Sequence, residues 1–234
     1  MFTRSTIVLG TVATAYLATA ASADFVGFDG EVSTNGDFTI IKMKAVFDTP
    51  NDIALNAFEM NISTEDGGGF HHSDVQIGAG GTWAPNASLN IPGFADSSID
   101  SYATIGYGVG ADAATNGTAL DPTWLDATGG LGAYVPSGAG WYNGNPVSQQ
   151  TGSSYGGGED GLAGYAVNLG QFVFETSRLS IDDDFDFFVF EGEFGYAQGT
   201  DVKFGADLFT WGVPAPGALA LLGLGGIATR RRRN

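Results

Sequence analysis

Apolar and polar residues alternate along several segments of this 234-residue chain. In residues 38–47, one parity carries Lys42 and Lys44, whereas the other carries the apolar residues Ile41, Met43, Ala45 and Phe47. A period of two residues is typical of a strand that buries one face and exposes the other. The segment is therefore predicted to be a half-buried β-strand.

Further segments with the same pattern extend this prediction along the chain. Residues 53–63 are expected to be a second strand, joined to the first through the turn-forming residues 48–52 as a hairpin. Residues 24–35 are interpreted as a polar segment that leads into the first strand, and 70–77 as a short strand. Four later strands are predicted at 101–109, 164–176, 185–197 and 201–211.

The fold class predicted from these segments is all-β. No segment of residues 24–212 shows a 3.6-residue apolar stripe. Short strands at fairly regular spacing favour an antiparallel β-sandwich, with a jelly-roll as one arrangement. Residues 78–161 are rich in small and polar residues and contain long predicted loops. Loops of this length are functional, ordered by ions, or hide short strands, and we expect hidden strands to account for part of them.

The N-terminus has the features of a secretory signal peptide. Arg4 supplies positive charge, residues 5–20 are apolar and small, and Ala21 and Ala23 flank Ser22 in the small-x-small form of a cleavage site. Residues 1–23 are therefore predicted to be removed by signal peptidase, so that the mature chain begins at Asp24. The predicted sandwich domain then spans residues 24–212.

The last 22 residues, 213–234, have three parts in a fixed order. A short motif comes first, followed by an apolar run over residues 218–228 and a basic cluster. The motif is Val213, Pro214, Ala215, Pro216 and Gly217, and the cluster is Arg230, Arg231, Arg232 and Arg233. We expect a hydrophobic helix, near the short end for spanning a bilayer, with the arginines held on the cytoplasmic side.

This layout resembles the PEP-CTERM sorting signal of bacteria that use an exosortase. The resemblance covers about a tenth of the chain, and Ala215 stands where the commonest form of the motif has glutamate. It implies export, recognition in the membrane, and removal of the tail by an exosortase-type enzyme near the proline motif. An ordinary C-terminal membrane anchor with a basic flank is the alternative. The resemblance also implies a cell-surface or extracellular location in a matrix-forming bacterium.

Charge and composition narrow the function of the domain. All 26 acidic residues lie between residues 24 and 212, where the basic residues are Lys42, Lys44, Arg178 and Lys203. Such an acidic surface excludes ordinary nucleic-acid binding, which depends on neutralising phosphates. The absence of cysteine excludes thiol catalysis and thiolate metal sites. The 37 glycines together with 12% aromatic residues indicate short strands and tight turns.

Two candidate metal sites stand out among the polar residues. The densest acidic cluster could provide the oxygen ligands that Ca²⁺ prefers, although it lacks EF-hand spacing; it consists of Asp182, Asp183, Asp184 and Asp186. The other candidate is His71–His72. Neighbours in a strand point to opposite faces, so one histidine with Asp74 could bind a metal. Solvated residues in a turn or at a strand boundary are the alternative at both places.

No catalytic motif or cofactor-binding motif is present, and the expected function is non-enzymatic. We expect an exported structural or adhesive protein of the cell surface or extracellular matrix. Aromatic residues in Gly-rich segments suggest a carbohydrate-binding module as the first alternative, with extracellular polysaccharide as partner; they are Trp83, Trp124, Trp141, Tyr134, Tyr142 and Tyr155. Equally, such side chains could pin the loops to the core. A secreted hydrolase is the second alternative, with a cleft holding paired carboxylates or a histidine.

Overall fold

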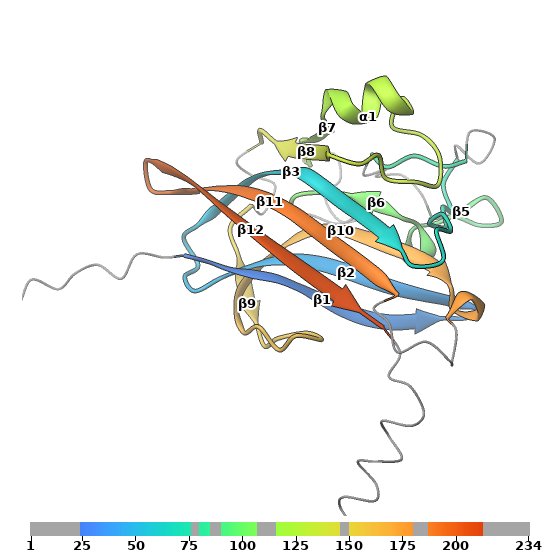
Figure 1. Cartoon of the computed structure of the whole chain (residues 1–234), viewed down its shortest axis with the longest axis horizontal. Helices are drawn as coiled ribbons and strands as arrows, with labels where there is room; N and C mark the ends of the chain where they lie inside the picture. The colour runs from blue at the N-terminus through green and yellow to red at the C-terminus, as the bar shows by residue number, and fades with distance from the viewer. Residues whose placement is uncertain are drawn as a thin grey trace, which may run out of the picture.

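The computed structural model describes residues 24–75, 80–84, 90–106, 116–145, 150–179 and 187–212. Two five-stranded antiparallel sheets form most of this part (Figure 1). The strands of the first sheet are β1 (Phe25–Asn35), β2 (Phe38–Phe47), β6 (Tyr102–Ala103), β9 (Ser153–Tyr155) and β10 (Gly164–Glu175). Those of the second are β3 (Ile53–Thr64), β7 (Thr118–Leu120), β8 (Ala139–Asn143), β11 (Phe188–Gln198) and β12 (Asp201–Trp211).

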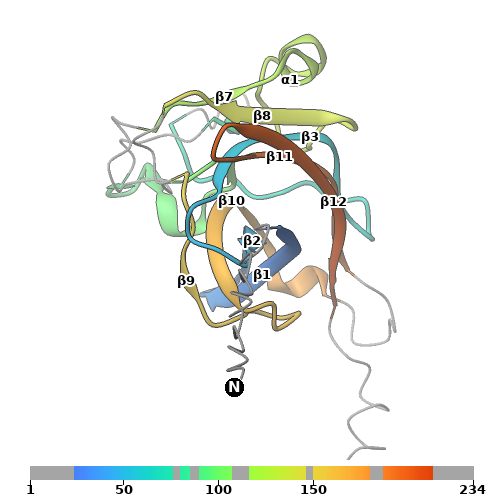
Figure 2. The ribbon, with the colours of Figure 1, turned by 90° about the vertical axis from the view of Figure 1, so that its left-hand side faces the viewer.

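The order of strands places sequence-distant segments side by side. The first sheet runs β1-β2-β10-β6, with β9 also paired to β10, and the second runs β12-β11-β3-β8-β7. Seen end-on, the sheet with β3, β11 and β12 curves over the sheet with β1, β2 and β10 (Figure 2). A small pair, β4 (Asn90–Ile91) and β5 (Ala95–Asp96), lies in the connections. The predicted all-β class and sandwich architecture are confirmed at this level.

Aromatic side chains fill the space between the sheets. The apolar parity predicted for β2 is buried, and so are the phenylalanines of β10 and β11, which makes the period-two interpretation correct for these strands. Phe28 of β1 meets Phe190 of β11 edge-to-face at 5.0 Å between ring centroids. Burying each large aromatic ring contributes on the order of 2–3 kcal/mol, so this layer supplies most of the apolar stabilisation.

Three predictions about the strands were wrong. Residues 25–35 form β1 rather than a polar lead-in, and the first hairpin is β1–β2, turning at Gly36, whose φ is +60°. β2 and β3 do not form a hairpin, because residues 48–52 carry the chain from one sheet to the other. Residues 70–75 are not a strand.

In two strands, β3 and β12, the apolar residues do not all face the core. A register shift in β3, where Glu59 has φ +52°, turns Phe58 to the outer face, against Phe204 of β12. In β12 the apolar parity, which includes Phe204 (65% exposed), faces outward. The inward parity carries Asp207, whose Oδ2 accepts a 2.7 Å hydrogen bond from the Phe28 backbone N–H of β1. That bond joins the edges of the two sheets, and on the same parity Phe209 is buried in the core with Trp211 packed against it.

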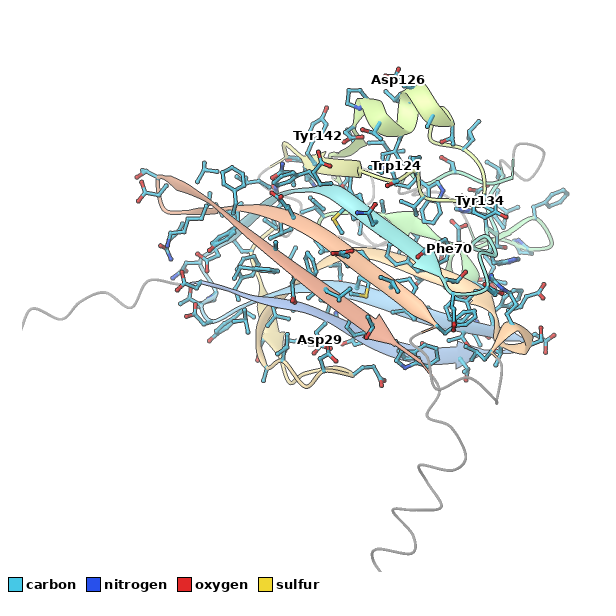
Figure 3. The ribbon with its side chains drawn as sticks, viewed as in Figure 1. Asp29, Phe70, Trp124, Asp126, Tyr134 and Tyr142 are labelled. Atoms are coloured by element: carbon cyan, nitrogen blue, oxygen red, sulfur yellow. The ribbon has the colours of Figure 1, made fainter. Side chains whose placement is uncertain are left out.

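The long central loops do contain short elements, as expected. Strands β4 to β9 lie here, together with one short helix, α1 (Pro122–Ala127), whose N-cap Asp121 accepts from the Thr123 N–H at 2.9 Å. Figure 3 shows Trp124 pointing inward from α1 and Asp126 outward. No helix within the described residues is long and apolar enough to cross a membrane.

Candidate functional site

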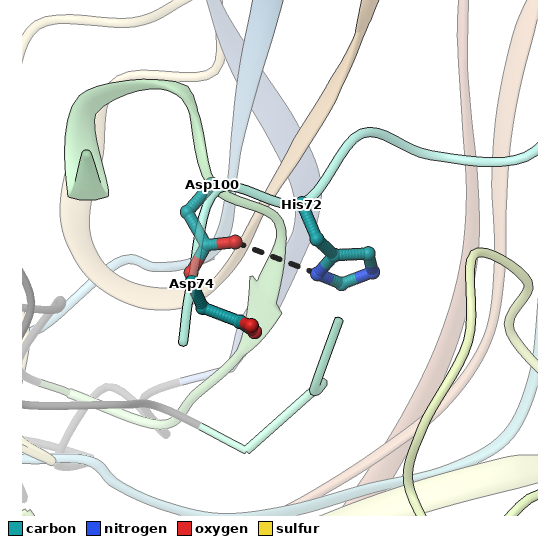
Figure 4. Close-up of side chains that lie close together, drawn as sticks. All are labelled: His72, Asp74 and Asp100. Carbon is teal, nitrogen blue, oxygen red and sulfur yellow. Dashed lines mark ion pairs between the residues drawn. The ribbon is translucent and has the colours of Figure 1, made fainter. Parts of the chain in front are cut away.

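Three polar side chains converge in the connections beside β10. His72 and Asp74 lie in the segment that follows β3, and Asp100 follows a 3-10 turn at Ser97–Ile99. Each offers one potential ligand atom, and these atoms lie within 4.8 Å of one another (Figure 4). We call these three residues the His–Asp–Asp cluster.

Backbone hydrogen bonds fix the segments that carry the cluster. The N–H of His71 donates to the carbonyl of Val173 in β10 at 2.7 Å, and the N–H of Ser101 donates to the carbonyl of His71 at 3.1 Å. The N–H of Ala103 reaches the carbonyl of Trp83 at 2.9 Å. These hydrogen bonds link the segments around residues 71, 83 and 101–103 to one another and to β10. They hold the backbone that carries the cluster.

The two neighbouring histidines point in different directions, although the alternation argument assumed a strand and residues 70–75 do not form one. The ring of His71 packs against Phe38, with centroids 4.2 Å apart, and its burial lowers the pKa of this imidazole. The side chain of His72 turns into the cluster and is only 3% exposed. The structure therefore brings His72 together with Asp74 and leaves His71 outside. The alternative that both histidines are surface residues is wrong for His72.

Both carboxylates of the cluster are oriented by the backbone. Asp100 accepts a 2.9 Å hydrogen bond from the N–H of Ser73 on Oδ1, and Asp74 accepts a 2.6 Å bond from the N–H of Thr82 on Oδ2. Asp74 is fully buried and the side chain of Asp100 is 2% exposed. Burial raises the pKa of Asp100, and nearby His72 opposes that rise.

The imidazole of His72 has neighbours on its faces but no hydrogen-bond partner. Its ring stands perpendicular to that of Trp83, with centroids 4.8 Å apart. Gly81, at φ +94°, lies so close that a Cβ there would overlap the imidazole carbons. Nδ1 lies 3.5 Å from Oδ1 of Asp100, and neither ring nitrogen forms a hydrogen bond in the described structure. The site is tightly enclosed, yet its donor and acceptor groups are incompletely matched.

Asp100 is the member that sequence reasoning missed. Asp100 lies before the two-residue strand β6 and belongs to no recognisable sequence motif. It comes close to His72 only when the connecting segments fold against each other. The candidate calcium ligands Asp182, Asp183, Asp184 and Asp186 lie outside the described residues. So do the cleavage-site residues Ala21 and Ala23, and the whole tail 213–234; Asp24 is described and precedes β1.

Two other acidic turns are held by the protein itself. Arg178 donates from Nε and Nη2 to the two carboxylate oxygens of Asp66, at 2.9 and 2.6 Å, and this pairing holds the pKa of Asp66 well below its usual range. The turn at residues 158–162 donates backbone N–H groups to Asp29, which is buried in β1. These contacts make both turns structural.

The aromatic residues proposed as a sugar platform divide into two groups. Trp83, Trp124 and Trp141 are 0–1% exposed and pack in the core, which bears out the interpretation that large aromatics pin the loops. Tyr134 and Tyr142 are 60% and 50% exposed, as Figure 3 shows beside α1. A separate hollow on the outer face of the second sheet is lined by three glutamates and by Leu208; the glutamates are Glu59, Glu191 and Glu193.

Comparison of the chain with protein-family models, with curated proteins and with solved structures gave no match.

Proposed function

We propose that this chain is an exported, non-enzymatic protein with a structural or adhesive role at the cell surface or in the extracellular matrix. The enclosure of the His–Asp–Asp cluster carries the proposal. A surface hollow borders His72, but the side chains of His72 and Asp100 are only 2–3% exposed, whereas catalysis requires the reacting groups to reach a substrate. A closed polar cluster suits a domain that has to persist rather than turn over substrate. A jelly-roll-like strand order is part of this proposal.

The two ends of the chain support export. In this proposal signal peptidase cleaves after Ala23, and residues 218–228 hold the tail in the membrane as a helix until an exosortase-type enzyme cuts within 213–217. The acidic domain then faces outward and Arg230–Arg233 face the cytoplasm, as the positive-inside tendency requires. The reversal of charge across the apolar run is the observation that supports this orientation.

Mass spectrometry of the protein recovered from its native host tests this proposal. We expect an N-terminus at Asp24 and a C-terminus between residues 213 and 217, in the surface or matrix fraction. A variant with Arg230–Arg233 changed to serine should accumulate unprocessed, whereas the same number of lysines should preserve processing. An intact C-terminal Asn234 on the surface protein would turn the sorting signal into a permanent anchor, and cytoplasmic retention would refute export.

A carbohydrate-binding role is the second candidate, because Tyr134 and Tyr142 remain exposed. Aromatic faces stack on the apolar faces of sugar rings. A glycan array probed with and without calcium should show saturable binding that a Tyr142→Ala variant loses and a Tyr155→Ala variant keeps. Absence of binding to every glycan would leave the structural role. A hydrolase is less well supported, since a substrate would need access to His72.

A further inference from the structure

We propose that His72, Asp74 and Asp100 bind one divalent transition-metal ion, with zinc the best fit, at a buried site where the ion stabilises the fold. The inference is independent of where the protein is located, because it rests on the geometry of three buried side chains. Each step of the argument concerns a different property of the cluster: the unsatisfied imidazole, the spacing of the ligand atoms, the orientation of the carboxylates and the identity of the ion.

The first argument is the state of the imidazole. Buried polar atoms are nearly always hydrogen-bonded, and leaving one without a partner is unfavourable. Both nitrogens of His72 are buried without a hydrogen bond, on a side chain that is 3% exposed. Nδ1 faces the two carboxylates (Figure 4). An ion on Nδ1 would provide the missing partner at this nitrogen.

The spacing of the ligand atoms is the second argument. The 3.5 Å separation of His72 Nδ1 and Asp100 Oδ1 exceeds the ~2.7–3.2 Å of a normal N–H···O hydrogen bond. Two ligand atoms bound to one tetrahedral zinc at about 2.0–2.2 Å lie roughly 3.3–3.5 Å from each other. The observed separation therefore matches a pair of metal ligands better than a hydrogen bond. The third ligand atom, on Asp74, is already within 4.8 Å of both.

The carboxylates are also supported as metal ligands usually are. Metal-binding side chains are commonly oriented by hydrogen bonds from outer groups. Here the Ser73 N–H holds Asp100 and the Thr82 N–H holds Asp74. Packing of Gly81 and Trp83 against the imidazole fixes the orientation of His72. Two carboxylates buried together also repel each other, and a dication between them would remove that repulsion.

The donor set indicates which ion fits. Imidazole nitrogen suits zinc and the other later transition metals, whereas calcium takes six to eight oxygen ligands. One nitrogen and two carboxylates supply three of the four positions of a tetrahedral zinc site. The ion would bond together the segments 70–75 and 97–101, which are joined in the described structure by hydrogen bonds. We therefore expect its effect to be on stability.

Metal titration of the full-length protein, purified in mild detergent and stripped with a chelator, tests the proposal. We expect one equivalent of zinc to bind in 0.5 M NaCl, since a buried site is little affected by screening. At a hundredfold excess over Kd, the thermal midpoint should rise by roughly 5–10 °C. Cobalt(II) should bind in competition with zinc and give visible absorption bands of a low-coordinate site. Binding should weaken as the pH falls, because metal ligands must be deprotonated to bind the ion.

Matched variants decide whether the ion sits in this cluster. Asp100→Asn and Asp74→Asn each keep an oxygen for the backbone N–H and remove a charged ligand, so they should fold and lose the binding at least tenfold. His71→Gln changes the adjacent histidine outside the cluster and should bind as the wild type does. A folded, stripped protein that binds neither zinc nor cobalt overturns the proposal. Weak, salt-sensitive binding that Asp100→Asn retains would assign the ion to the acidic surface and overturn it too.

Discussion

Asp29 and the His–Asp–Asp cluster are two buried acidic centres that the fold completes in different ways. Asp29 is fully buried in β1 and accepts hydrogen bonds of 2.7–3.1 Å from the backbone N–H groups of Gly30, Gly158, Asp160 and Leu162. Four donors surround one carboxylate, as a buried charge requires. The cluster is equally buried, yet it leaves an imidazole unsatisfied and places two carboxylates together.

The difference separates a finished structural clamp from a site that needs another component. Asp29 ties the turn at 158–162 to β1 using groups that the chain itself supplies. His72 and Asp100 are positioned by backbone N–H groups and ring packing, but within the described residues neither ring nitrogen of His72 has a hydrogen-bond partner. Burial alone therefore does not mark a functional residue. The cluster differs from Asp29 because it combines burial, an unmatched imidazole and ligand atoms within 4.8 Å of one another.

Replacing Asp29 by alanine should have the largest effect on stability. The change removes the acceptor of four backbone N–H groups, of which that of Gly30 is buried and the three in the turn are part-buried; a fully buried donor costs about 1–3 kcal/mol when left without a partner. We expect the free energy of unfolding to fall by about 3 kcal/mol, measured by urea denaturation followed by tryptophan fluorescence. Asp126→Ala on the exposed face of α1 is the control, expected within about 0.5 kcal/mol of wild type. A loss below about 1 kcal/mol at Asp29 would mean that water replaces the carboxylate.

Zinc should increase the loss of unfolding free energy caused by substitutions in the cluster. It should not change the loss caused by substitution of Asp29. At a hundredfold excess of zinc over its Kd, Asp100→Asn should lose about 2.7 kcal/mol of stabilisation that wild type gains from the ion. Asp29→Asn should show the same deficit with and without zinc. The comparison between the two centres breaks down if zinc shifts both variants equally in urea unfolding curves.

Without metal, Asp100→Asn should be neutral or mildly stabilising at pH 7. Burial raises the pKa of Asp100, so the folded state binds this proton more tightly than the unfolded state does. The protonated Asp100 side chain therefore contributes to the free energy of unfolding fully below about pH 4, the pKa of an aspartate in the unfolded chain. This contribution is lost as pH rises through the pKa of Asp100 in the folded state. The variant removes that loss, so stripped Asp100→Asn should have a slightly higher free energy of unfolding than stripped wild type at neutral pH. Unfolding free energies of stripped wild type and variant, compared from pH 4 to 7, check the sign.

Asp66 offers a third carboxylate, one that is partly exposed and paired by a side chain. Because Arg178 lowers the pKa of Asp66, the stabilisation is present above about pH 4 and fades as pH falls further. The side chain of Asp66 is 38% exposed, so solvent screening limits the loss in Asp66→Asn to about 1 kcal/mol at pH 7. Glu31→Gln, which breaks a more exposed pair with Lys44, should change almost nothing.

The alternation of apolar and polar residues predicted those strands that have one clearly apolar face and one polar face. β2, β10, β11 and β12 were found within a few residues of their bounds, because one parity of each carries large apolar or aromatic side chains. β1 was missed, since glycines and polar residues interrupt its pattern and Phe28 is the one large ring at its buried centre. The pairing of β2 with β10 was not predictable, because a turn at 48–52 is compatible with both a hairpin and a crossover.

Only those residues of the candidate site that are close together in sequence could be predicted. The different orientations of His71 and His72 agree with the expectation, although the strand on which it rested is not formed, and Asp74 was close enough in sequence to be considered with them. Asp100 belongs to the cluster through contacts between connections, which no spacing rule encodes. The outward apolar face of β12 likewise depends on long-range contacts: on the inward parity, Asp207 accepts from the Phe28 N–H and Phe209 is buried in the core.

The strand order also determines when this domain can fold. β2 pairs with β10 and β3 pairs with β11, so each sheet joins the first third of the domain to the last. Such distant pairings are slow to form, because a long loop must close before any contact rewards it. Until β10 and β11 are present, β2 can pair only with β1 and β3 lacks its partner β11. The apolar faces of both strands then remain exposed and prone to aggregate. A chain of this topology reaches its native state as a whole, after nearly all of it is available, and its rate of folding is a property of its connections more than of its strands.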